Sequence, residues 1–128
     1  MTNIEAPEVA GKIFHVDDDG DFTAKLNEVL QSHGYSVVLT AVTVAQAILL
    51  IPERLIQAGV NLAIIDGHLP GGSGEGIASK IRASNLHVPI IALTAQENTT
   101  WGDQNVCKAD GPRSLLQAIA TALETKPG

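Results

Sequence analysis

The amino-acid sequence predicts an α/β protein in which helices cover a doubly wound, five-stranded parallel sheet. Short aliphatic runs alternate along the chain with segments whose apolar residues recur at helical spacing. Hydrophobic residues make up 45% of the 128 residues but aromatic residues only 3%, so the core is aliphatic. Such a core suits strands covered by helices better than an aromatic-rich β-sandwich. A chain of this length forms one domain with a single core.

Two short strands enclose the first predicted helix. Residues 12–16 form the short first strand, residues 35–40 form the second strand, and Gly34 is a C-terminal stop for the helix between them. The apolar positions of this helix recur at helical spacing. They are Phe22, Leu26, Val29 and Leu30.

The spacing of Thr43 and Gln46 is that of a capping box and predicts the start of the second helix. Pro52 cannot continue this helix, so we expect a break there and a further helical turn over residues 53–58. The second helix has an apolar stripe that we expect to face the core. It consists of Ala45, Ile48, Leu49 and Leu50.

The third strand contains the continuous apolar run of residues 62–65, which is typical of a strand buried on both faces of a parallel sheet. It covers residues 61–65, and a loop with Pro70 and four glycines follows. A helix over residues 75–83 comes next, with Ile77 and Ile81 facing inward.

The last two strands and the last helix complete the alternation. Residues 88–93 form the fourth strand and residues 105–107 the fifth. Gly111 and Pro112 have the features of the N-cap and first residue of the last helix. Its predicted buried stripe is Leu115, Leu116, Ile119, Ala120 and Leu123.

The interval between the fourth and fifth strands breaks the pattern. Residues 96–104 are polar, show no helical period and contain one large apolar side chain, Trp101. A helix of ordinary length with its two loops would not fit there. An extended loop of this size reaches roughly 26 Å or more, which exceeds the about 17–20 Å length of a strand. We therefore predict an extended loop as the crossover, with Trp101 covering the core that the absent helix leaves exposed.

Composition and charge exclude several classes of partner. The formal net charge is -6 and the isoelectric point about 5.0, which argues against a nucleic-acid or anionic-membrane partner. One cysteine excludes an internal disulfide and suits a reducing compartment. Residues 37–51 are the longest apolar region and are too short to span a bilayer. We expect a cytoplasmic protein with a loose tail over residues 1–11, no signal peptide, and a domain over residues 12–125.

Polar side chains stand at the ends of the predicted strands and after the last one. They are Asp17 and Asp18, Asp66, Thr94 and Lys108. In a doubly wound sheet these strand ends share one crevice. Carboxylates brought together repel one another unless a cation joins them, and Mg²⁺ prefers such oxygen ligands. The set suits transfer of a phosphoryl group, in which Asp66 attacks while Mg²⁺, Lys108 and Thr94 hold the phosphoryl oxygens.

Simpler interpretations of each residue remain open at this point. The acidic run Asp17–Asp19 could cap the first helix, and Asp66 could start a turn. Thr94 and Lys108, each taken singly, could be a strand-end residue and a surface lysine. His15 lies on the first strand, and we expect it to be a satisfied core or edge histidine.

Four short motifs occur in order, with suitable separations. They are Val16-Asp17-Asp18-Asp19; Asp66-Gly67-His68-Leu69-Pro70 with Gly74 four residues after the proline; Pro89-Ile90-Ile91-Ala92-Leu93-Thr94-Ala95; and Lys108 followed by Gly111-Pro112 and Leu115-Leu116. Together they make the sequence resemble the receiver domain of two-component response regulators over nearly the whole chain. The resemblance implies a flavodoxin-like topology.

The same resemblance implies a role for each site residue. Asp66 would be the phosphorylation site, assisted by Thr94 and Lys108. Asp18 would bind Mg²⁺ directly and Asp17 largely through water. The remaining metal ligands from the protein would be Asp66 itself and the backbone carbonyl of His68. The positions of His68 and Gln96 are ones that tune the lifetime of the phosphoryl group.

By this resemblance the chain takes its phosphoryl group from the phosphohistidine of a histidine kinase or a histidine phosphotransfer protein. It would promote its own phosphorylation and dephosphorylation without being a turnover enzyme. Because the chain ends at Gly128, we expect its output to pass through contacts with an unknown downstream protein. The alternative is a pseudo-receiver, a protein-interaction module that signals without phosphorylation. A Mg²⁺-dependent phosphatase is the weakest of the three readings.

Three departures from the family pattern bear on how the signal is transmitted. The helix between the fourth and fifth strands is missing, and Asn105 stands where a switch aromatic is expected. Ala109 replaces the proline that normally follows the lysine and that normally has a cis peptide bond. Because a cis bond before a non-proline residue costs about 2.5–4 kcal/mol, we predict that the Lys108–Ala109 bond is trans.

Overall fold

The computed structural model describes residues 11–96 and 98–124. A five-stranded sheet with the order β2-β1-β3-β6-β7 forms the middle layer, and its neighbouring strands are parallel. The strands are β1 (Lys12–Val16), β2 (Ser36–Ala41), β3 (Leu62–Asp66), β6 (Ile90–Thr94) and β7 (Gln104–Cys107). The predicted doubly wound α/β fold is confirmed.

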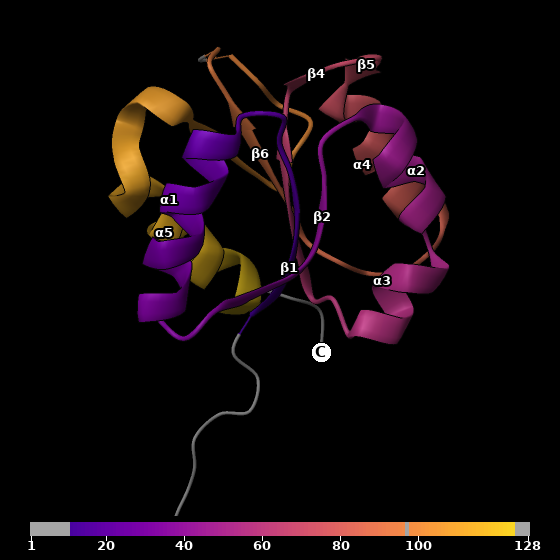
Figure 1. Ribbon diagram of the computed structural model, residues 1–128, viewed down its shortest axis with the longest axis horizontal. Coiled ribbons are helices and arrows are strands. Elements are labelled where there is room, and N and C mark those ends of the chain that lie inside the picture. The colour runs from indigo at the N-terminus through magenta and orange to yellow at the C-terminus, as the bar shows by residue number, and fades with distance from the viewer. Residues whose placement is uncertain (1–10, 97, 125–128) are drawn as a thin grey trace, which may run out of the picture.

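Helices cover both faces of this sheet. α1 and α5 lie on one face, and α2, α3 and α4 lie on the other (Figure 1). Their bounds are α1 (Gly20–Ser32), α2 (Val44–Leu50), α3 (Glu53–Ala58), α4 (Gly74–Ala83) and α5 (Gly111–Glu124), with a 3₁₀ turn η1 (Lys108–Asp110) before α5. No helix in the described part of the chain is long and apolar enough to cross a membrane.

The sheet divides the core into two aliphatic clusters. Under α2–α4 the largest fully buried side chains are Phe14, Leu55, Ile65, Ile77, Ile81 and Ile90. Under α1 and α5 they are Ile13, Leu30, Leu62, Ile64, Ile91 and Leu93. Alternate residues of one strand belong to opposite clusters because side chains alternate across a strand.

The predicted tail falls almost entirely outside the described residues, as does the predicted domain end at residue 125. The one described residue of the tail, Gly11, is buried. Its carbonyl accepts a hydrogen bond of 2.9 Å from the backbone N–H of Ser36. Gly11 is therefore hydrogen-bonded to β2, and the predicted tail and domain bounds stay predictions.

Thr43 caps α2 as predicted, and of the predicted stripe Ile48 and Leu50 pack on the core, whereas Ala45 and Leu49 do not. The backbone N–H of Gln46 donates to Thr43 Oγ1 at 3.1 Å. Leu49 is 81% exposed and Ala45 is exposed, whereas Ala47 is fully buried. Ala45 and Leu49 are four residues apart and so share one face of the helix, whereas Ala47 lies between them on the other face. When Ala47 faces the core, Ala45 and Leu49 therefore both face solvent. Those packed beside it are Val44, Ile48 and Leu50.

The break at Pro52 is confirmed, since α2 ends at Leu50 and α3 begins at Glu53. β1 has the predicted bounds, and the other four predicted strands are shifted by one or two residues, most of all at the start of β6, which is Ile90 instead of Val88. In α5, Leu115 and Ile119 are buried as predicted. Ala118 and Ala122 are also buried there, although the predicted stripe omitted them.

The crossover between β6 and β7 contains no helix or strand among the described residues of 95–103, as predicted. Trp101 is half-buried and packs on the core cluster under α2–α4, which confirms its predicted covering role. Asp103 fixes the end of the loop: its N–H donates to the Ile90 carbonyl at 2.7 Å, and its Oδ2 accepts from the Ile90 N–H at 2.8 Å. Among the described residues the cis peptide bond is Ile51–Pro52, so Lys108–Ala109 is trans as predicted.

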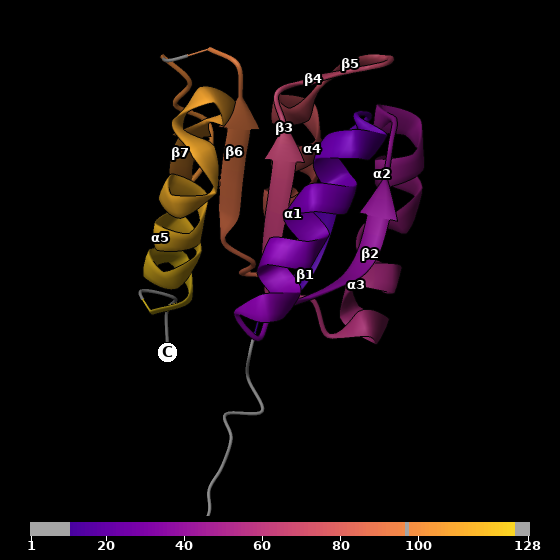
Figure 2. The ribbon, with the colours of Figure 1, turned by 60° about the vertical axis from the view of Figure 1, so that its left-hand side comes forward.

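The glycine loop after β3 contains a small antiparallel hairpin that the sequence did not predict. β4 (His68–Leu69) pairs with β5 (Gly72–Ser73), and the turn needs positive φ angles of 89° at Gly71 and 151° at Gly72. This hairpin lies at the edge of the sheet to which the arrowheads of β2, β3 and β6 point (Figure 2). The polar residues expected at the strand ends gather at this edge.

Candidate functional site

Three carboxylates converge at the carboxyl ends of β1 and β3. Asp17 and Asp18 follow β1 directly, and Asp66 is the last residue of β3. One oxygen from each lies within 4.8 Å of the other two. Asp17 and Asp66 are buried and Asp18 is exposed. The predicted gathering of these three residues is confirmed.

The helix cap is supplied by a different aspartate. Asp19 is the N-cap of α1, and its Oδ1 accepts from the backbone N–H of Phe22 at 3.1 Å. The Asp19 N–H in turn donates to Asp17 Oδ1 at 2.9 Å. One member of the acidic run therefore serves the helix, while Asp17 and Asp18 face the cluster.

Lys108, which follows β7, reaches across the crevice to two of these carboxylates. Its Nζ lies 3.0 Å from Asp17 Oδ2 and 3.2 Å from Asp66 Oδ2. Burial alone would lower the pKa of Lys108, but the hydrogen bond and charge of Asp17, followed by those of Asp66, raise it overall. The ammonium therefore keeps its proton and joins the two buried carboxylates.

The surroundings of Asp66 disfavour the charged form of its carboxyl group. Burial raises the pKa of Asp66; the N–H of His68 lowers it, the charge of Asp17 raises it and Lys108 lowers it, with a net rise. His68 is exposed in β4, and its N–H donates to Asp66 Oδ1 at 3.2 Å. The predicted role of the His68 carbonyl as a metal ligand stays a prediction.

The cluster fits a small divalent cation. Two oxygens that each lie about 2.1 Å from Mg²⁺ are at most about 4.2 Å apart. The observed spread of up to 4.8 Å is slightly larger, so the carboxylates would have to approach one another by about 0.6 Å to bind one ion directly. Asp17, Asp18 and Asp66 bring three negative charges to one edge, and Lys108 neutralises one of them, so a cation would relieve the remaining repulsion.

Thr94 ends β6 and is buried beside the site, but its hydroxyl faces the crossover loop. Thr94 Oγ1 donates to the Gln96 carbonyl at 2.7 Å and lies 3.0 Å from Thr99 Oγ1. The Gln96 N–H donates back to Thr94 Oγ1 at 3.2 Å. Among the described residues no hydrogen bond joins this hydroxyl to the three aspartates, so the structure places Thr94 at the site without directing it into the cluster.

Two glycines form the backing of the Asp66 loop. A Cβ at Gly67 would lie 2.5 Å from Thr94 Cγ2. A Cβ at Gly74 would overlap the Asp66 carbonyl oxygen and lie 2.7 Å from Ile65 Cγ2. The Trp101 indole lies behind both, 3.7 Å and 3.0 Å from those two positions. The main chain of Asp66 is therefore packed without a gap from behind.

His15 is a residue near the site whose surroundings differ from the prediction. It is 2% exposed, and its Nε2 has no hydrogen-bond partner among the described residues. The same atom lies 3.9 Å from Asp17 Oδ2. Burial lowers the pKa of His15 to about 4; Asp17 raises it and Lys108 lowers it. The predicted satisfied histidine is wrong for Nε2, although the spacing of two residues on one strand already put His15 and Asp17 on the same face.

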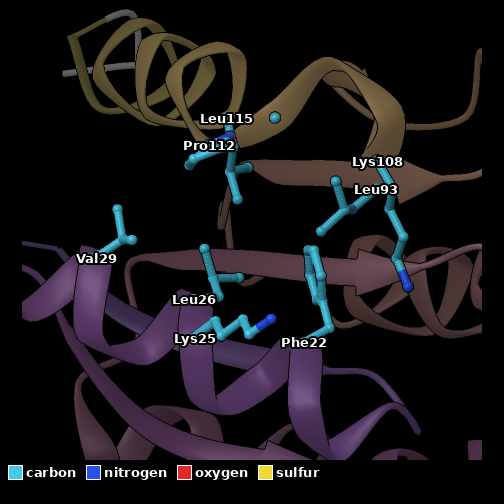
Figure 3. A pocket seen from close by; sticks show the side chains of 9 residues that line it. Phe22, Lys25, Leu26, Val29, Leu93, Lys108, Pro112 and Leu115 are labelled. Carbon is cyan, nitrogen blue, oxygen red and sulfur yellow. The ribbon is translucent and has the colours of Figure 1, made fainter.

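A groove opens beside the site between α1 and α5, with a volume of about 220 Å³. Its lining is mainly apolar, and the side chains face one another across it (Figure 3). The lining residues are Phe22, Lys25, Leu26, Val29, Leu93, Lys108, Gly111, Pro112 and Leu115. Lys108 belongs to both places, because its Nζ also lies 4.7 Å from the centroid of the Phe22 ring.

Comparison with known sequences agrees with this geometry. A family model described as the response regulator receiver domain matches residues 13–120. The phosphate regulon transcriptional regulatory protein PhoB of Pseudomonas aeruginosa is 31% identical over 131 residues, covering 94% of this chain and 55% of that protein. The regulatory protein VanR of Enterococcus faecium is 28% identical over 123 residues, covering 90% and 51%. The chain thus spans about half the length of these curated relatives.

Solved structures show the same fold. The receiver domain protein of Methanospirillum hungatei superposes with a TM-score of 0.78 at 24% identity, covering 91% of this chain and 96% of that one. The receiver domain of PhyR from Erythrobacter litoralis gives 0.77 at 21% identity, covering 93% and 94%. At these identities the likeness concerns the fold alone.

Proposed function

This chain belongs to the family of response regulator receiver domains, and we propose that it takes a phosphoryl group from a phosphohistidine donor onto Asp66. The observation that carries the proposal is the Lys108 ammonium placed between Asp17 and Asp66 at the edge of an acidic cluster. A lysine that already touches the acceptor carboxylate can follow the phosphoryl oxygens as they arrive. An ion pair that only stabilised the fold would not need a third, exposed carboxylate such as that of Asp18.

The chemical step is a displacement at phosphorus. An Asp66 carboxylate oxygen forms the new P–O bond as the P–N bond to the donor imidazole breaks, and the imidazole leaves with the bonding electron pair. Asp66 is positioned for this by the His68 N–H on Oδ1 and by Lys108 on Oδ2. Bound Mg²⁺, held by Asp17, Asp18, Asp66 and the His68 carbonyl, supplies charge that offsets the phosphoryl oxygens. The protein contributes mainly positioning and electrostatic stabilisation.

Two groups change partners in this proposal. Lys108 moves its hydrogen bonds from the carboxylates to a phosphoryl oxygen. Thr94 has to release Gln96 and Thr99 before its hydroxyl can donate to the phosphoryl group. Phosphorylation is thereby coupled to the crossover loop, which takes the place of the missing helix.

The groove between α1 and α5 is the surface we assign to the phosphodonor, a histidine kinase or histidine phosphotransfer protein. Its apolar lining suits the apolar face of a partner helix, and it adjoins the acceptor through Lys108. A helix seated there would bring its histidine to the same edge as Asp66. Any downstream protein is unidentified; the net charge of -6 gives this domain no electrostatic attraction to nucleic acid.

The test is intact-mass analysis after incubation with acetyl phosphate and Mg²⁺. We expect the wild type to gain the mass of one phosphoryl group and Asp66→Asn to gain none. Asp21→Asn, an exposed aspartate in the first turn of α1 outside the cluster, is the matched control and keeps the gain. An unmodified wild type would support the pseudo-receiver instead, and modification surviving in Asp66→Asn would place the acceptor elsewhere. Phosphate release far beyond one per protein that persists in Asp66→Asn would indicate a turnover enzyme that does not act through Asp66.

Mg²⁺ is expected to stabilise the folded protein through the same cluster. At a free Mg²⁺ concentration ten times the Kd, binding adds about 1.4 kcal/mol to the free energy of unfolding, which raises Tm by about 4–6 °C. Asp18→Asn removes an exposed ligand without disturbing the buried ion pair, so at the same concentration its Tm rises by less than about 2 °C. Differential scanning calorimetry with and without Mg²⁺ measures both values. An equal rise in the wild type and Asp18→Asn would remove Asp18 from the metal site.

A further inference from the structure

A buried polar atom beside Asp17, His15 Nε2, has no part in the proposed chemistry. Asp17 Oδ1 accepts from the Asp19 N–H, and Oδ2 faces Lys108 at 3.0 Å and His15 Nε2 at 3.9 Å. The side chain of Asp17 has no exposed area and that of His15 is 2% exposed. A buried polar atom without a partner is rare and costly, so the position of His15 calls for an explanation.

The distance of 3.9 Å is about 1 Å longer than an N–H···O hydrogen bond. In the described state Lys108 forms an ion pair with the same oxygen, but Oδ2, like His15 Nε2, has no hydrogen-bond partner among the described residues. The balance changes when Lys108 turns to a phosphoryl oxygen, because Oδ2 of a fully buried carboxylate then also loses its ion-pair partner. His15 Nε2 is the next polar atom toward the interior, and a shift of about 1 Å brings it into hydrogen-bond range.

We propose that His15 is a positioning residue for Asp17: its Nε2–H takes over Oδ2 when Lys108 leaves for the phosphoryl group, and so holds Asp17 in place for Mg²⁺. The step is an exchange of hydrogen-bond partners and forms no covalent bond. The inference rests on the proposed function for the event that moves Lys108. Its contacts, however, can be examined without any phosphoryl donor.

The first experiment removes Lys108 by mutation instead of by phosphorylation. Mg²⁺ affinity is measured by isothermal titration calorimetry for the wild type, His15→Leu, Lys108→Met and the double variant. We expect His15→Leu to weaken binding less than about threefold when Lys108 is present and about tenfold in the Lys108→Met background, the low end of the effect of outer-layer partners of metal ligands. His15→Gln, whose amide N–H replaces Nε2–H, restores binding in the Lys108→Met background.

The second experiment reads the imidazole directly in the unmodified sequence. ¹⁵N chemical shifts of His15 in the Lys108-containing protein report which ring nitrogen carries the proton, and we expect Nε2. A proton on Nδ1, an equal loss of Mg²⁺ affinity in both backgrounds, or failure of His15→Gln to restore binding would each overturn the proposal. If the protein is not phosphorylated at all, the proposed function fails while these measurements still decide whether His15 supports Asp17.

Discussion

Replacing Gly74 by alanine is expected to destabilise the protein by about 3 kcal/mol. Gly74 is the first residue of α4, and its N–H donates to the Gly67 carbonyl at 3.2 Å. An added Cβ would overlap the Asp66 carbonyl oxygen and would lie close to side-chain atoms of Ile65 and Trp101. A backbone carbonyl cannot rotate away as the tip of a long side chain can. Relief therefore requires moving the main chain that carries the Asp66 carboxylate.

The same helix provides the control. Gly76 lies two residues further along α4, and a Cβ there has no neighbour within 4 Å. Gly76→Ala is expected to stabilise the protein by about 0.5–1 kcal/mol, because alanine loses less conformational entropy than glycine in a helix. Urea unfolding of the three proteins measures both effects. Equal stability of the two variants would show that Gly74 is not needed for close packing behind Asp66.

Stability is also expected to fall by about 3 kcal/mol between pH 7 and pH 4 through His15. The buried imidazole has a pKa of about 4 in the folded protein against 6.5 in the unfolded chain, and one unit corresponds to about 1.4 kcal/mol. Below pH 6.5 the imidazole is protonated in the unfolded state, whereas in the folded state it stays neutral until the pH nears 4. The contribution of His15 to stability is therefore complete above pH 6.5 and is lost as the pH falls toward 4.

Asp66 acts in the opposite direction over part of this range. Because its pKa is raised in the folded protein, the folded state takes up a proton before the unfolded state does, and stability rises as the pH falls through that value. Comparison with His15→Leu cancels this contribution, since both proteins contain Asp66. Urea unfolding at pH 7, 5.5 and 4.5 with EDTA should show that the free energy of unfolding of His15→Leu rises relative to that of the wild type as the pH falls. Parallel pH profiles would contradict the buried neutral state of His15.

Much of the fold was predictable because its signals are local. The central strands β3 and β6 are aliphatic runs, and the caps at Thr43 and Pro52 mark helix boundaries that the structure confirms. The helix-free crossover followed from length and polarity alone. The stripe of α2 was not predictable in this way, because in a helix of seven residues several faces are apolar. Contact with the sheet selects the face that contains the small Ala47.

The site was predictable in its membership but not in its hydrogen bonds. Strand ends of a parallel sheet meet at one edge, so Asp17, Asp18 and Asp66 converge and Lys108 reaches Asp17 and Asp66. The direction of the Thr94 hydroxyl depends on the backbone of a loop without regular structure, which no periodicity describes. The β4–β5 hairpin likewise depends on glycine dihedral angles, and only the tertiary fold selects these.

Trp101 gives this molecule an internal optical reporter. It is the single tryptophan of the chain, so the tryptophan fluorescence of the protein arises at one place. That place is the rear of the Asp66 loop, where the indole faces Gly67 and Gly74. The one large ring that covers the core at the crossover thus makes the state of the Asp66 loop visible without any label.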